Sequence, residues 1–518
     1  MSQPCHPNFI FRGRVGVAQY IVALDLGTTG NRAIVFDQAG DIVGQAYLEL
    51  TQYYPQPGWV EHDPLEIWAA VQTTLKQAVQ AAGILASDIA ALGLTVQRET
   101  CLLWDKTTGQ PLHNAIVWQD RRTADLCHQL ADAREEIYER TGLFLDAYFS
   151  ATKLRWLLEK TQPTDLDNVL AGTIDAWALW NLTGGKVHAT DHSNASRTLL
   201  MNLQQQQWDG QMLDYFQVPA QLLPEIRPSQ GYFGTLRSDL LGAEIPIMAI
   251  FGDQQAALFA HGCNQPGLLK CTYGTGAFLV AHTGKTLPRS HNQLLSTIAW
   301  TTAKAPSAPN SPGPYDLGYA LEGSMFTAGA CIQWLRDGLK AIDNAADSEI
   351  LATSIEDNGG VYFVPALSGL GAPHWDMSAR GAFMGITRGS TNAHMVRAVL
   401  EAIANQAKEV VQAINEDCGT PIQTLKVDGG ACKNDFLMQY QADVLGIPVE
   451  RPAVLDATAQ GSAFGAGLAV GLWQDYDALV SSRKIDRVFE PGQQAPRAQE
   501  QFKQWQVAVG RTKDWPTA

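Results

Sequence analysis

The chain has 518 residues, of which 46% are hydrophobic and 17% charged, a composition typical of a globular protein with more than one core. Its 37 basic and 52 acidic residues give a formal charge of −15, and no Lys/Arg-rich run of five or more residues is present. A nucleic-acid partner is therefore not expected, whereas a local basic pocket for a small anion is compatible with this charge. Two large domains are the default expectation for this length.

The eight cysteines are scattered without a CxxC pair, which indicates reduced thiols and a cytoplasmic location rather than disulfides or a zinc site. Residues 1–19 contain no continuous apolar stretch, so we predict a flexible N-terminal extension and no secretory signal. The stretch ATAQGSAFGAGLAVGLW at 457–473 is too short to span a membrane and is rich in glycine and alanine. We expect a helix that lies close against neighbouring backbone, and no membrane insertion.

The N-terminal half is predicted to begin with an antiparallel meander and to continue as an α/β layer. Strand-like runs cover 20–24, 32–37 and 41–50, separated by the turn-rich GTTGN and QAG. Residues 64–83 have helical spacing of apolar residues, and IAALGLTV at 89–96 is typical of a strand. This mixture of strand and helix predicts a layered α/β domain.

A similar order returns in the C-terminal half. Residues 268–284 predict a strand, a glycine turn and a strand, and residues 425–446 predict a strand ending at Asp428, a double glycine and a helix. LDLGTT, TYGTGAF and VDGGACKN thus share one plan, which by itself is a weak sign of repetition because strand-to-glycine turns are common. Gly/Pro punctuation at 261–268 predicts a domain boundary, and the Pro/Ser-rich stretch 303–314 predicts an exposed loop.

Phosphate binding would need a device other than the common nucleotide motifs. No GxxxxGK[ST] P-loop is present, and no GxGxxG follows a strand. The stretch YIVALDLGTTG offers one device, since glycine turns aim backbone N–H groups at an anion and threonine hydroxyls add donors. Asp25 at the strand end would then hold magnesium. A plain hairpin turn with an exposed Asp25 is the competing interpretation, and the segment alone does not choose between them.

Other polar residues also follow apolar runs. Asp253 comes after the run at 245–252 and before a helix-like segment, where open α/β sheets place functional groups. A helix N-cap is the alternative and, for the segment alone, the better supported one. Arg98, Glu99 and Trp118 could bind the hydroxyls and carbons of a small polyol, or form a surface ion pair and a core tryptophan.

Long motifs in a fixed order resemble those of the FGGY carbohydrate kinases, and in particular the members that phosphorylate glycerol. They include LDLGTTGNRA, GLTVQRET, NAIVWQDRRT, TDHSNASRT, FGDQQAALF, TYGTGAF, ALEGSMFTAGACIQWLRDGLK, SGLGAPHWD and VDGGACKNDFLMQYQADVLG, and the similarity runs from about Tyr20 to about Pro491. The resemblance implies an α/β fold with two ribonuclease H-like (actin/hexokinase/Hsp70 ATPase) domains flanking an active-site cleft. It implies Mg²⁺-dependent transfer of the ATP γ-phosphoryl group to the terminal hydroxyl of glycerol, giving sn-glycerol 3-phosphate and ADP.

The resemblance also implies a division of the chain and a role for individual residues. The implied segments are the extension 1–19, an N-terminal FGGY domain with the glycerol site and phosphate turn (20–262), a nucleotide-binding C-terminal FGGY domain (263–491) and a tail (492–518). Residues implied to bind glycerol are Arg98, Glu99, Trp118, Tyr148, Asp253, Gln254 and Phe278. Residues implied to contact the nucleotide are Thr28, Thr29, Gly30, Arg32, Thr275, Gly329, Gln333, Gly430, Ala431 and Asn434. Asp253 would act as general base on the attacking hydroxyl, and Asp25 and Asp253 would ligate Mg²⁺.

Some positions depart from the family pattern. Gly30 and Asn31 stand where many relatives have serines, so one hydroxyl contact to the phosphates would be lost or replaced by a backbone N–H. The short stretch 236–247 replaces a loop that binds fructose 1,6-bisphosphate in some relatives, so that form of feedback is not expected. His192 lies in a loop that some relatives phosphorylate, with solvent exposure as the plainer explanation.

Two other functions stay open beside glycerol phosphorylation. A kinase for a pentulose or other sugar would be expected to depart at the QRE and Trp positions. A non-catalytic protein of the ATPase fold would have no reason to keep Asp253 or a polyol pocket. The expected partners are glycerol and ATP, without nucleic acid or membrane insertion, and self-association into a homo-oligomer, dimer or tetramer, is expected.

Overall fold

The computed structural model describes residues 19–303 and 315–515. Nearly all of the predicted N-terminal extension and of the predicted Pro/Ser-rich loop therefore lies outside the described residues. Within the two described ranges, none of the helices combines the length and the apolar character that a bilayer crossing requires.

The N-terminal half is built on a sheet whose first three strands form the predicted meander. β1 (Tyr20–Leu26), β2 (Gly30–Phe36) and β3 (Ile42–Glu49) are antiparallel neighbours. β5 (Ile89–Val96) and β14 (Pro246–Gly252) extend the sheet as parallel strands on the other side of β1. The strand order is β3-β2-β1-β5-β14, and the predicted meander and following strand are confirmed.

The C-terminal half repeats this plan. β15 (Leu268–Tyr273), β16 (Ala277–Gly284) and β18 (Tyr315–Met325) are antiparallel neighbours. β21 (Thr424–Asp428) and β22 (Val449–Pro452) follow as parallel strands beside β15. The order β18-β16-β15-β21-β22 corresponds strand for strand to β3-β2-β1-β5-β14. The shared turn plan in the sequence, weak by itself, thus reflects two sheets of the same design.

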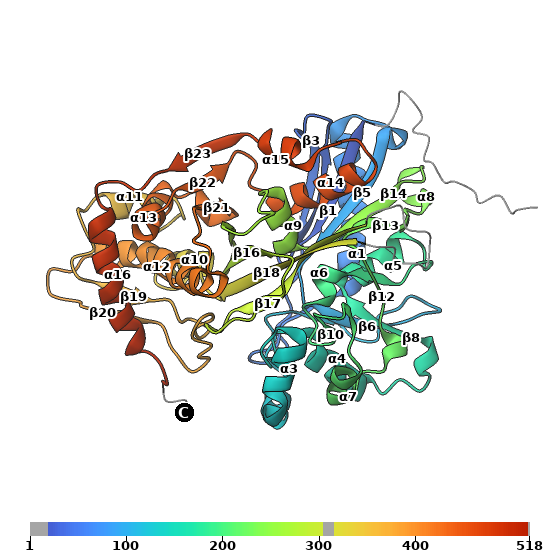
Figure 1. The fold of residues 1–518 in the computed structure, drawn as a ribbon, viewed down its shortest axis with the longest axis horizontal. Helices are drawn as coiled ribbons and strands as arrows, with labels where there is room; N and C mark the ends of the chain where they lie inside the picture. Colours follow the sequence, from blue (N-terminus) through green and yellow to red (C-terminus); the bar gives the residue numbers. More distant parts are fainter. Residues whose placement is uncertain (1–18, 304–314, 516–518) are drawn as a thin grey trace, which may run out of the picture.

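The two sheets are continuous. β17 (Leu295–Ala303) pairs with β18 and meets β13 (Gln230–Thr235) through the register pair Gln230 and Thr302. β13 pairs with β14, so a 13-stranded sheet runs through the molecule, with β3 and β23 (Ile485–Phe489) at its edges. In Figure 1, β16, β17 and β18 lie between the blue N-terminal strands and the orange C-terminal helices.

The N-terminal half carries a further layer of short strands and helices. β4 (Glu61–His62), β6 (Cys101–Asp105), β7 (Ala115–Ile116) and β8 (Val169–Thr173) form a sheet in the order β4-β7-β6-β8. β9 (Ala189–Asp191) pairs with β12 (Glu225–Arg227), and β10 (Met201–Asn202) with β11 (Gln207–Trp208). The helices here are α2 (Ala124–Gln129), α3 (Arg134–Thr141), α4 (Ser150–Thr161), α5 (Ile174–Leu182), α6 (His192–Ala195), α7 (Gly210–Phe216) and α8 (Ser238–Leu241). β6 of this layer directly follows β5 in the chain, so the layer sets the surroundings of the β5–β6 corner.

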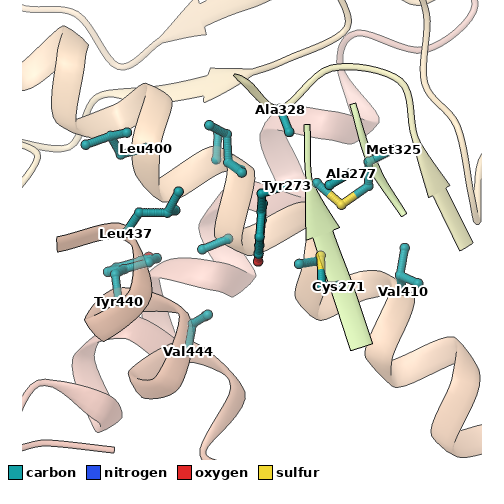
Figure 2. Close-up of a cluster of buried hydrophobic side chains, with 14 of the residues drawn as sticks. Cys271, Tyr273, Ala277, Met325, Ala328, Leu400, Val410, Leu437, Tyr440 and Val444 are labelled. Carbon is teal, nitrogen blue, oxygen red and sulfur yellow. The ribbon is translucent and has the colours of Figure 1, made fainter. Parts of the chain in front are cut away.

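The C-terminal core lies between the sheet and three helices, α12 (Asn392–Cys418), α13 (Asp435–Leu445) and α16 (Ala495–Gly510). Figure 2 shows the ring of Tyr273 among apolar side chains of these elements, and its hydroxyl donates to Gln441 Oε1 at 2.6 Å. Phe502 and Trp505 of α16 are buried in the same core. The segment predicted as a tail therefore contains a packed helix. The remaining elements of this half are α10 (Gly329–Asp337), α11 (Asp347–Thr353), β19 (Tyr362–Val364), β20 (Ala382–Met384) and α15 (Tyr476–Ser481).

Helix α14 (Ala457–Ala469) comes from the C-terminal part of the chain but packs on the N-terminal sheet, against β1, β5 and α9 (Asp253–Ala260). Val22 and Leu24 pack in one apolar cluster with α1 (Pro64–Ala82), whereas Ile21 and Ala23 pack in another with α14. Alternate residues of a strand point to opposite faces, so α1 and α14 cover the two faces of β1. The prediction of a helix close against neighbouring backbone is confirmed.

Candidate active site

Arg98 and Glu99 lie at the corner between β5 and β6. Only 3% and 2% of their surfaces are exposed, so the alternative of a surface ion pair is wrong. Glu99 has a φ of 63°, in the left-handed region that non-glycine residues rarely adopt, and such strain concentrates at functional sites. The Glu99 carbonyl accepts a hydrogen bond from Ser150 Oγ at 2.9 Å, which fixes the corner.

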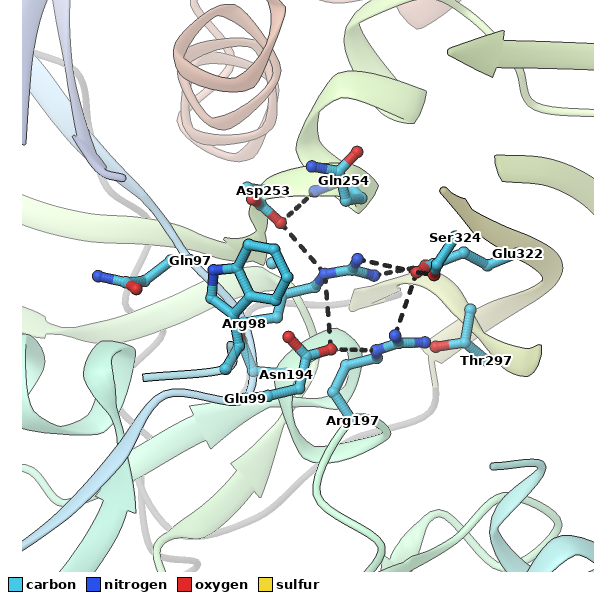
Figure 3. Close-up of polar contacts among 12 residues, drawn as sticks. Gln97, Arg98, Glu99, Asn194, Arg197, Asp253, Gln254, Thr297, Glu322 and Ser324 are labelled. Carbon is cyan, nitrogen blue, oxygen red and sulfur yellow. Dashed lines mark hydrogen bonds and ion pairs between the residues drawn. The ribbon is translucent and has the colours of Figure 1, made fainter. Parts of the chain in front are cut away.

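Carboxylates from three parts of the chain surround the guanidinium of Arg98 (Figure 3). Its Nε lies 3.1 Å from Asp253 Oδ1, and its Nη1 and Nη2 donate to the two oxygens of Glu322 at 2.5 and 2.9 Å. Arg197 donates from Nε to Glu99 Oε1 at 2.7 Å and from Nη2 to Glu322 Oε1 at 3.1 Å. Burial raises the pKa of Glu322, but Arg197 and Arg98 outweigh it and lower that pKa to about 2. Glu322 therefore stays ionised at neutral pH, whereas burial raises the pKa of Glu99 against the opposing effect of Arg197 and Arg98.

The sequence interpretation assigned no role to Arg197 or Glu322, although both lie in motifs that carry the family resemblance. A signal was present for Glu322, because it is the one charged residue in the buried strand stretch 319–325. A buried carboxylate requires a partner. The partner could not be named from the sequence, since Arg98 and Glu322 are 224 positions apart.

Asp253 is the first residue of α9, and Gly252 occupies the cap position, so the N-cap alternative is wrong. The Asp253 carboxylate accepts from the N–H of Gln254 at 2.7 Å and keeps 26% of its side chain exposed. It is thus held in place with one side open to a ligand. A Cβ at Gly252 would lie 2.7 Å from Arg98 Cδ, so the glycine lets Arg98 pass close to the start of α9.

Trp118, Tyr148 and Phe278 form an aromatic wall beside Arg98. The ring centroid of Trp118 lies 5.7 Å from that of Tyr148 and 5.8 Å from that of Phe278, both edge to face. Arg98 Cζ lies 5.8 Å from the Phe278 centroid. Trp118 Nε1 donates to Thr28 Oγ1 at 2.9 Å, which joins the wall to the first glycine turn. The structure thus brings together residues that the family resemblance assigns to one acceptor site.

Gln254 is buried and held by the ammonium group of Lys270. Lys270 Nζ donates to Gln254 Oε1, to Thr272 Oγ1 at 3.0 Å and to the Phe278 carbonyl at 3.2 Å. Burial lowers the pKa of Lys270, while the carboxylate of Asp428 acts in the opposite direction. Because Oε1 of Gln254 faces an ammonium, its NH₂ group is the end that can donate to a ligand.

Asp25 is partly buried at the end of β1, so the alternative of an exposed Asp25 is wrong. Burial raises its pKa to about 6, although Thr458 Oγ1 of α14 donates to Asp25 Oδ2 at 2.6 Å, and Asp253 is near enough to add to the rise. No group of three or more His, Cys, Asp or Glu side chains is arranged as a metal cage anywhere in the described parts of the chain. Two carboxylates fit Mg²⁺ nevertheless, since this ion often takes only one or two together with substrate phosphate oxygens.

Arg32 is the register partner of Asp25 on β2. Its guanidinium forms an ion pair with Asp456 at the start of α14 and lies 5.3 Å from the centroid of the Tyr47 ring. Thr29 is exposed at the turn, and its carbonyl accepts from Tyr47 Oη at 3.3 Å. The first glycine turn is thus backed by a tyrosine of β3 and by the helix from the C-terminal part of the chain.

Tyr47 also explains the missing family hydroxyl at Gly30. A Cβ at Gly30 would lie 2.5 Å from the Leu48 carbonyl oxygen and would collide with the Tyr47 ring. Asn31, the second residue that differs from the family pattern, donates from Nδ2 to the Ile67 carbonyl at 3.0 Å in the interior of the N-terminal half. Both departures are therefore accommodated by packing, and a serine at residue 30 would disturb the β2–β3 pairing.

The predicted nucleotide residues of the C-terminal half gather at the ends of β15 and β21. The Gly329 N–H donates to the Gly274 carbonyl and the Ala330 N–H to the Thr275 carbonyl, both at 3.0 Å. These bonds hold the start of α10 against the TYGTGAF turn. Thr275 and Gln333 are exposed beside it.

The VDGG turn packs against the end of β15. Gly429 has a φ of 87°, and a Cβ there would lie 2.5 Å from a backbone oxygen of β15. Gly430 and Ala431 begin a 3₁₀ turn (Gly430–Lys433), and open space surrounds the position of a Cβ at Gly430. Asn434 caps α13 by accepting a backbone N–H of its first turn at 2.8 Å. The two C-terminal turns are thus adjacent and present mostly backbone.

His192 is buried, whereas solvent exposure was the plainer expectation for it. Only 2% of its surface is exposed, and its Nδ1 lies 3.0 Å from Thr301 Oγ1. Burial lowers its pKa to about 4. The expectation of solvent exposure is wrong, and the ring is a neutral part of the interior.

The repeated sheet with glycine turns and the buried charged corner define a two-part α/β protein. Residues 20–260 match the N-terminal domain and residues 269–470 the C-terminal domain of the FGGY family of carbohydrate kinases. The chain belongs to the FGGY family of carbohydrate kinases.

Within this family, the chain is highly similar to proteins named as glycerol kinases. The chain is 70% identical over 504 residues to a glycerol kinase of Acaryochloris marina, with 96% of this chain and 99% of that protein covered. It is 51% identical over 503 residues to glycerol kinase 2 of Thermotoga maritima, with 96% and 99% covered.

Solved structures give the same family and fold. A glycerol kinase of Plasmodium falciparum, crystallised with ADP, superposes with a TM-score of 0.85 at 35% identity, with 96% of this chain and 98% of that chain covered. A gluconate kinase of Lactobacillus acidophilus superposes with a TM-score of 0.83 at 22% identity, with 95% and 98% covered, and this likeness shows the fold alone. The predicted fold class is confirmed.

Proposed function

We propose that the protein is an ATP-dependent glycerol kinase that transfers the γ-phosphoryl group to the terminal hydroxyl of glycerol, giving sn-glycerol 3-phosphate and ADP. The observation that carries the proposal is the buried corner of Arg98 and Glu99 beside Asp253, closed by the aromatic wall of Trp118 and Phe278. Charged groups suit hydroxyls and aromatic faces suit a short carbon chain. The names of the relatives agree with this acceptor.

Asp253 would be the general base. Its carboxylate is fixed by the N–H of Gln254 and by Arg98, and it keeps an open side from which it could accept the proton of the attacking hydroxyl. Arg98 and Glu99 would orient the other hydroxyls, since phosphoryl transfer depends mainly on alignment and charge stabilisation. Gln254 would donate its NH₂ group to the same acceptor.

The nucleotide would lie across the glycine turns of both halves. Thr28, Thr29 and Gly30 with Arg32 would face its phosphates from the N-terminal half. From the C-terminal half the contacts would be Thr275, Gly329, Gln333, Gly430, Ala431 and Asn434. Turns of this kind aim backbone N–H groups at an anion. Asp25 and Asp253 would hold Mg²⁺, which when bound neutralises phosphate charge.

We also propose the division of the chain at residues 262 and 263, with α14 as the segment that returns to the N-terminal sheet. The cytoplasm is the proposed location, because the seven cysteines within the described residues are free, as in reduced compartments. Self-association as a dimer or tetramer is proposed from the family resemblance, and light scattering of the purified protein would test it.

The proposal is tested by offering glycerol, xylulose, ribulose and gluconate to the purified protein with ATP and Mg²⁺. We expect glycerol to give the highest kcat/KM. A higher kcat/KM for one of the sugars would contradict the assignment. ATP hydrolysis without phosphorylation of any of these acceptors would contradict it as well.

A further inference from the structure

Glu322 is a carboxylate of the C-terminal half that lies inside the proposed acceptor site. It belongs to β18, is fully buried, and binds both terminal nitrogens of Arg98 in a fork. Paired hydrogen bonds of this kind fix the plane of a guanidinium as well as its place. Figure 3 shows the carboxylate of Glu322 next to the guanidinium of Arg98, with dashed lines joining Arg197 to Glu322 and to Glu99.

Arg197 completes a ring of alternating charges. It follows α6, is fully buried, and binds Glu322 and Glu99 through two different nitrogens. Arg98 Nε lies 3.9 Å from Glu99 Oε1, so the ring returns to its start. Each charge of the four thus has opposite charges on both sides, which offsets the cost of burying it.

Some polar groups of the ring have no hydrogen-bond partner among the described residues and could bind a ligand. Arg98 has five N–H donors. Nε faces Asp253, the Nη1 group reaches Glu322 and Gln255, and one N–H of Nη2 is used by Glu322. One N–H of Arg98 Nη2 therefore has no partner among the described residues, and the buried Nη1 of Arg197 has none either. Glu99 Oε1 is taken by Arg197, while its Oε2 accepts no hydrogen bond from any described residue.

We propose that Glu322 and Arg197 are positioning residues for the acceptor: they hold Arg98 and Glu99 so that one N–H and one carboxylate oxygen meet a hydroxyl-bearing substrate. The proposal deepens the proposed function and rests on its acceptor site. It makes acceptor binding depend on a strand of the C-terminal half. A purely structural ring would instead affect folding and both substrates alike.

Glu322→Gln is the primary test, because it keeps the shape of the side chain and removes its charge. With Arg98 no longer held by a carboxylate fork, we expect the KM for glycerol to rise about 10- to 100-fold, the effect of losing a hydrogen bond to a charged group. The KM for ATP is expected to stay within about twofold. An equal rise of both KM values, or no rise, overturns the proposal.

A charge-balanced variant guards against loss of folding. Glu322→Gln combined with Arg197→Gln removes one negative and one positive charge, so it avoids an unpaired buried charge. We expect this double variant to regain thermal stability but to keep the raised KM for glycerol. A double variant that regains a normal KM would show that charge balance, not positioning, mattered, and would overturn the proposal.

Glu401→Gln is the matched control. Glu401 is also a buried glutamate of the C-terminal half, and it pairs with Arg397 at 2.8 Å within α12, away from Arg98. We expect it to lower stability without changing the KM for glycerol. A comparable KM increase in this variant would mean that any buried charge loss has the effect, against the proposal.

Calorimetric titration with glycerol, without ATP, separates the inference from the proposed function. If the wild type binds glycerol but transfers no phosphate, the proposed function fails, and weaker binding by Glu322→Gln still supports the inference. Equal binding by wild type and variant overturns the inference. If the wild type binds no glycerol, both fail together.

Discussion

The acceptor side and the nucleotide side of the proposed site differ in what presents their polar groups. On the acceptor side, charged side chains such as Arg98 and Glu99 are almost fully buried and tied to each other by ion pairs. On the nucleotide side, Thr275, Gln333 and Gly430 are exposed, and the turns present mainly backbone. Buried ion pairs hold side chains in one geometry, whereas backbone turns accept an anion without a fixed side chain. We infer from this difference that acceptor selectivity resides on the first side and that the second side is suited to general phosphate binding.

The largest expected effect is that of Asp253→Asn on the acceptor side. We expect kcat to fall about 100- to 10,000-fold, because a general base contributes by that factor, while glycerol still binds. Kinetics combined with calorimetric glycerol titration measures the two separately. Near-normal turnover would remove Asp253 from the role of base.

Glu99→Gln tests whether buried charge sets acceptor selectivity. Loss of a charged hydrogen-bond acceptor is expected to raise the KM for glycerol about 10- to 100-fold and leave the KM for ATP unchanged. Steady-state kinetics with each substrate varied in turn checks this. If the KM for ATP rose as much, the two sides would not be separable and the comparison would break down.

Buried histidines should make the stability of the protein sensitive to acid, and three of the four histidines with a pKa of about 4 lie in the N-terminal half. Burial lowers the pKa of His62, His188 and His192 in the N-terminal half, and of His282 in the C-terminal half, to about 4. The unfolded chain, with an ordinary pKa of about 6.5, therefore binds more protons between pH 6.5 and 4. The contribution of these histidines to the free energy of unfolding should fall as pH drops through this window, by up to about 1.4 kcal/mol per pH unit for each residue. Asp25 and Asp175, whose pKa burial raises to about 6, contribute with the opposite sign.

Denaturant unfolding of His192→Asn at several pH values checks this sign. We expect a shallower decline of stability below pH 6.5 than in the wild type. His128→Asn is the matched control, because His128 is exposed and its replacement should leave the slope unchanged. A slope that is identical in both variants would contradict the account.

The smallest effect on substrate kinetics is expected at the VDGG turn. Gly430→Ala should fold normally, because nothing surrounds its Cβ position, but should raise the KM for ATP a few-fold if backbone approaches the nucleotide there. Gly429→Ala is the counterpart, with a φ of 87° and a β15 oxygen in the way. It should lower the free energy of unfolding by about 1–3 kcal/mol. An ATP KM unchanged in Gly430→Ala would place the nucleotide away from this turn.

Much of the fold could be predicted from the sequence because its signals are local. The meander at 20–50, helix α1 and strand β5 follow from apolar periodicity and turn residues, and the structure confirms them. The candidate site was predicted through the family motifs. Burial could not be judged from single segments, which is why the exposed alternatives for Asp25, Arg98 and His192 were wrong.

Local sequence signals specify the strands, the glycine turns that end them, and the residue types that acceptor and phosphate would need. Two features are visible in the tertiary structure alone. Glu322 pairs with Arg98, 224 positions away in the chain, and α14 packs on one face of β1. The two kinds of feature depend on interactions that act over different distances along the chain. Periodicity and turn chemistry act between neighbours in the chain, whereas a buried charge or an apolar face is satisfied by whatever the folded chain brings next to it.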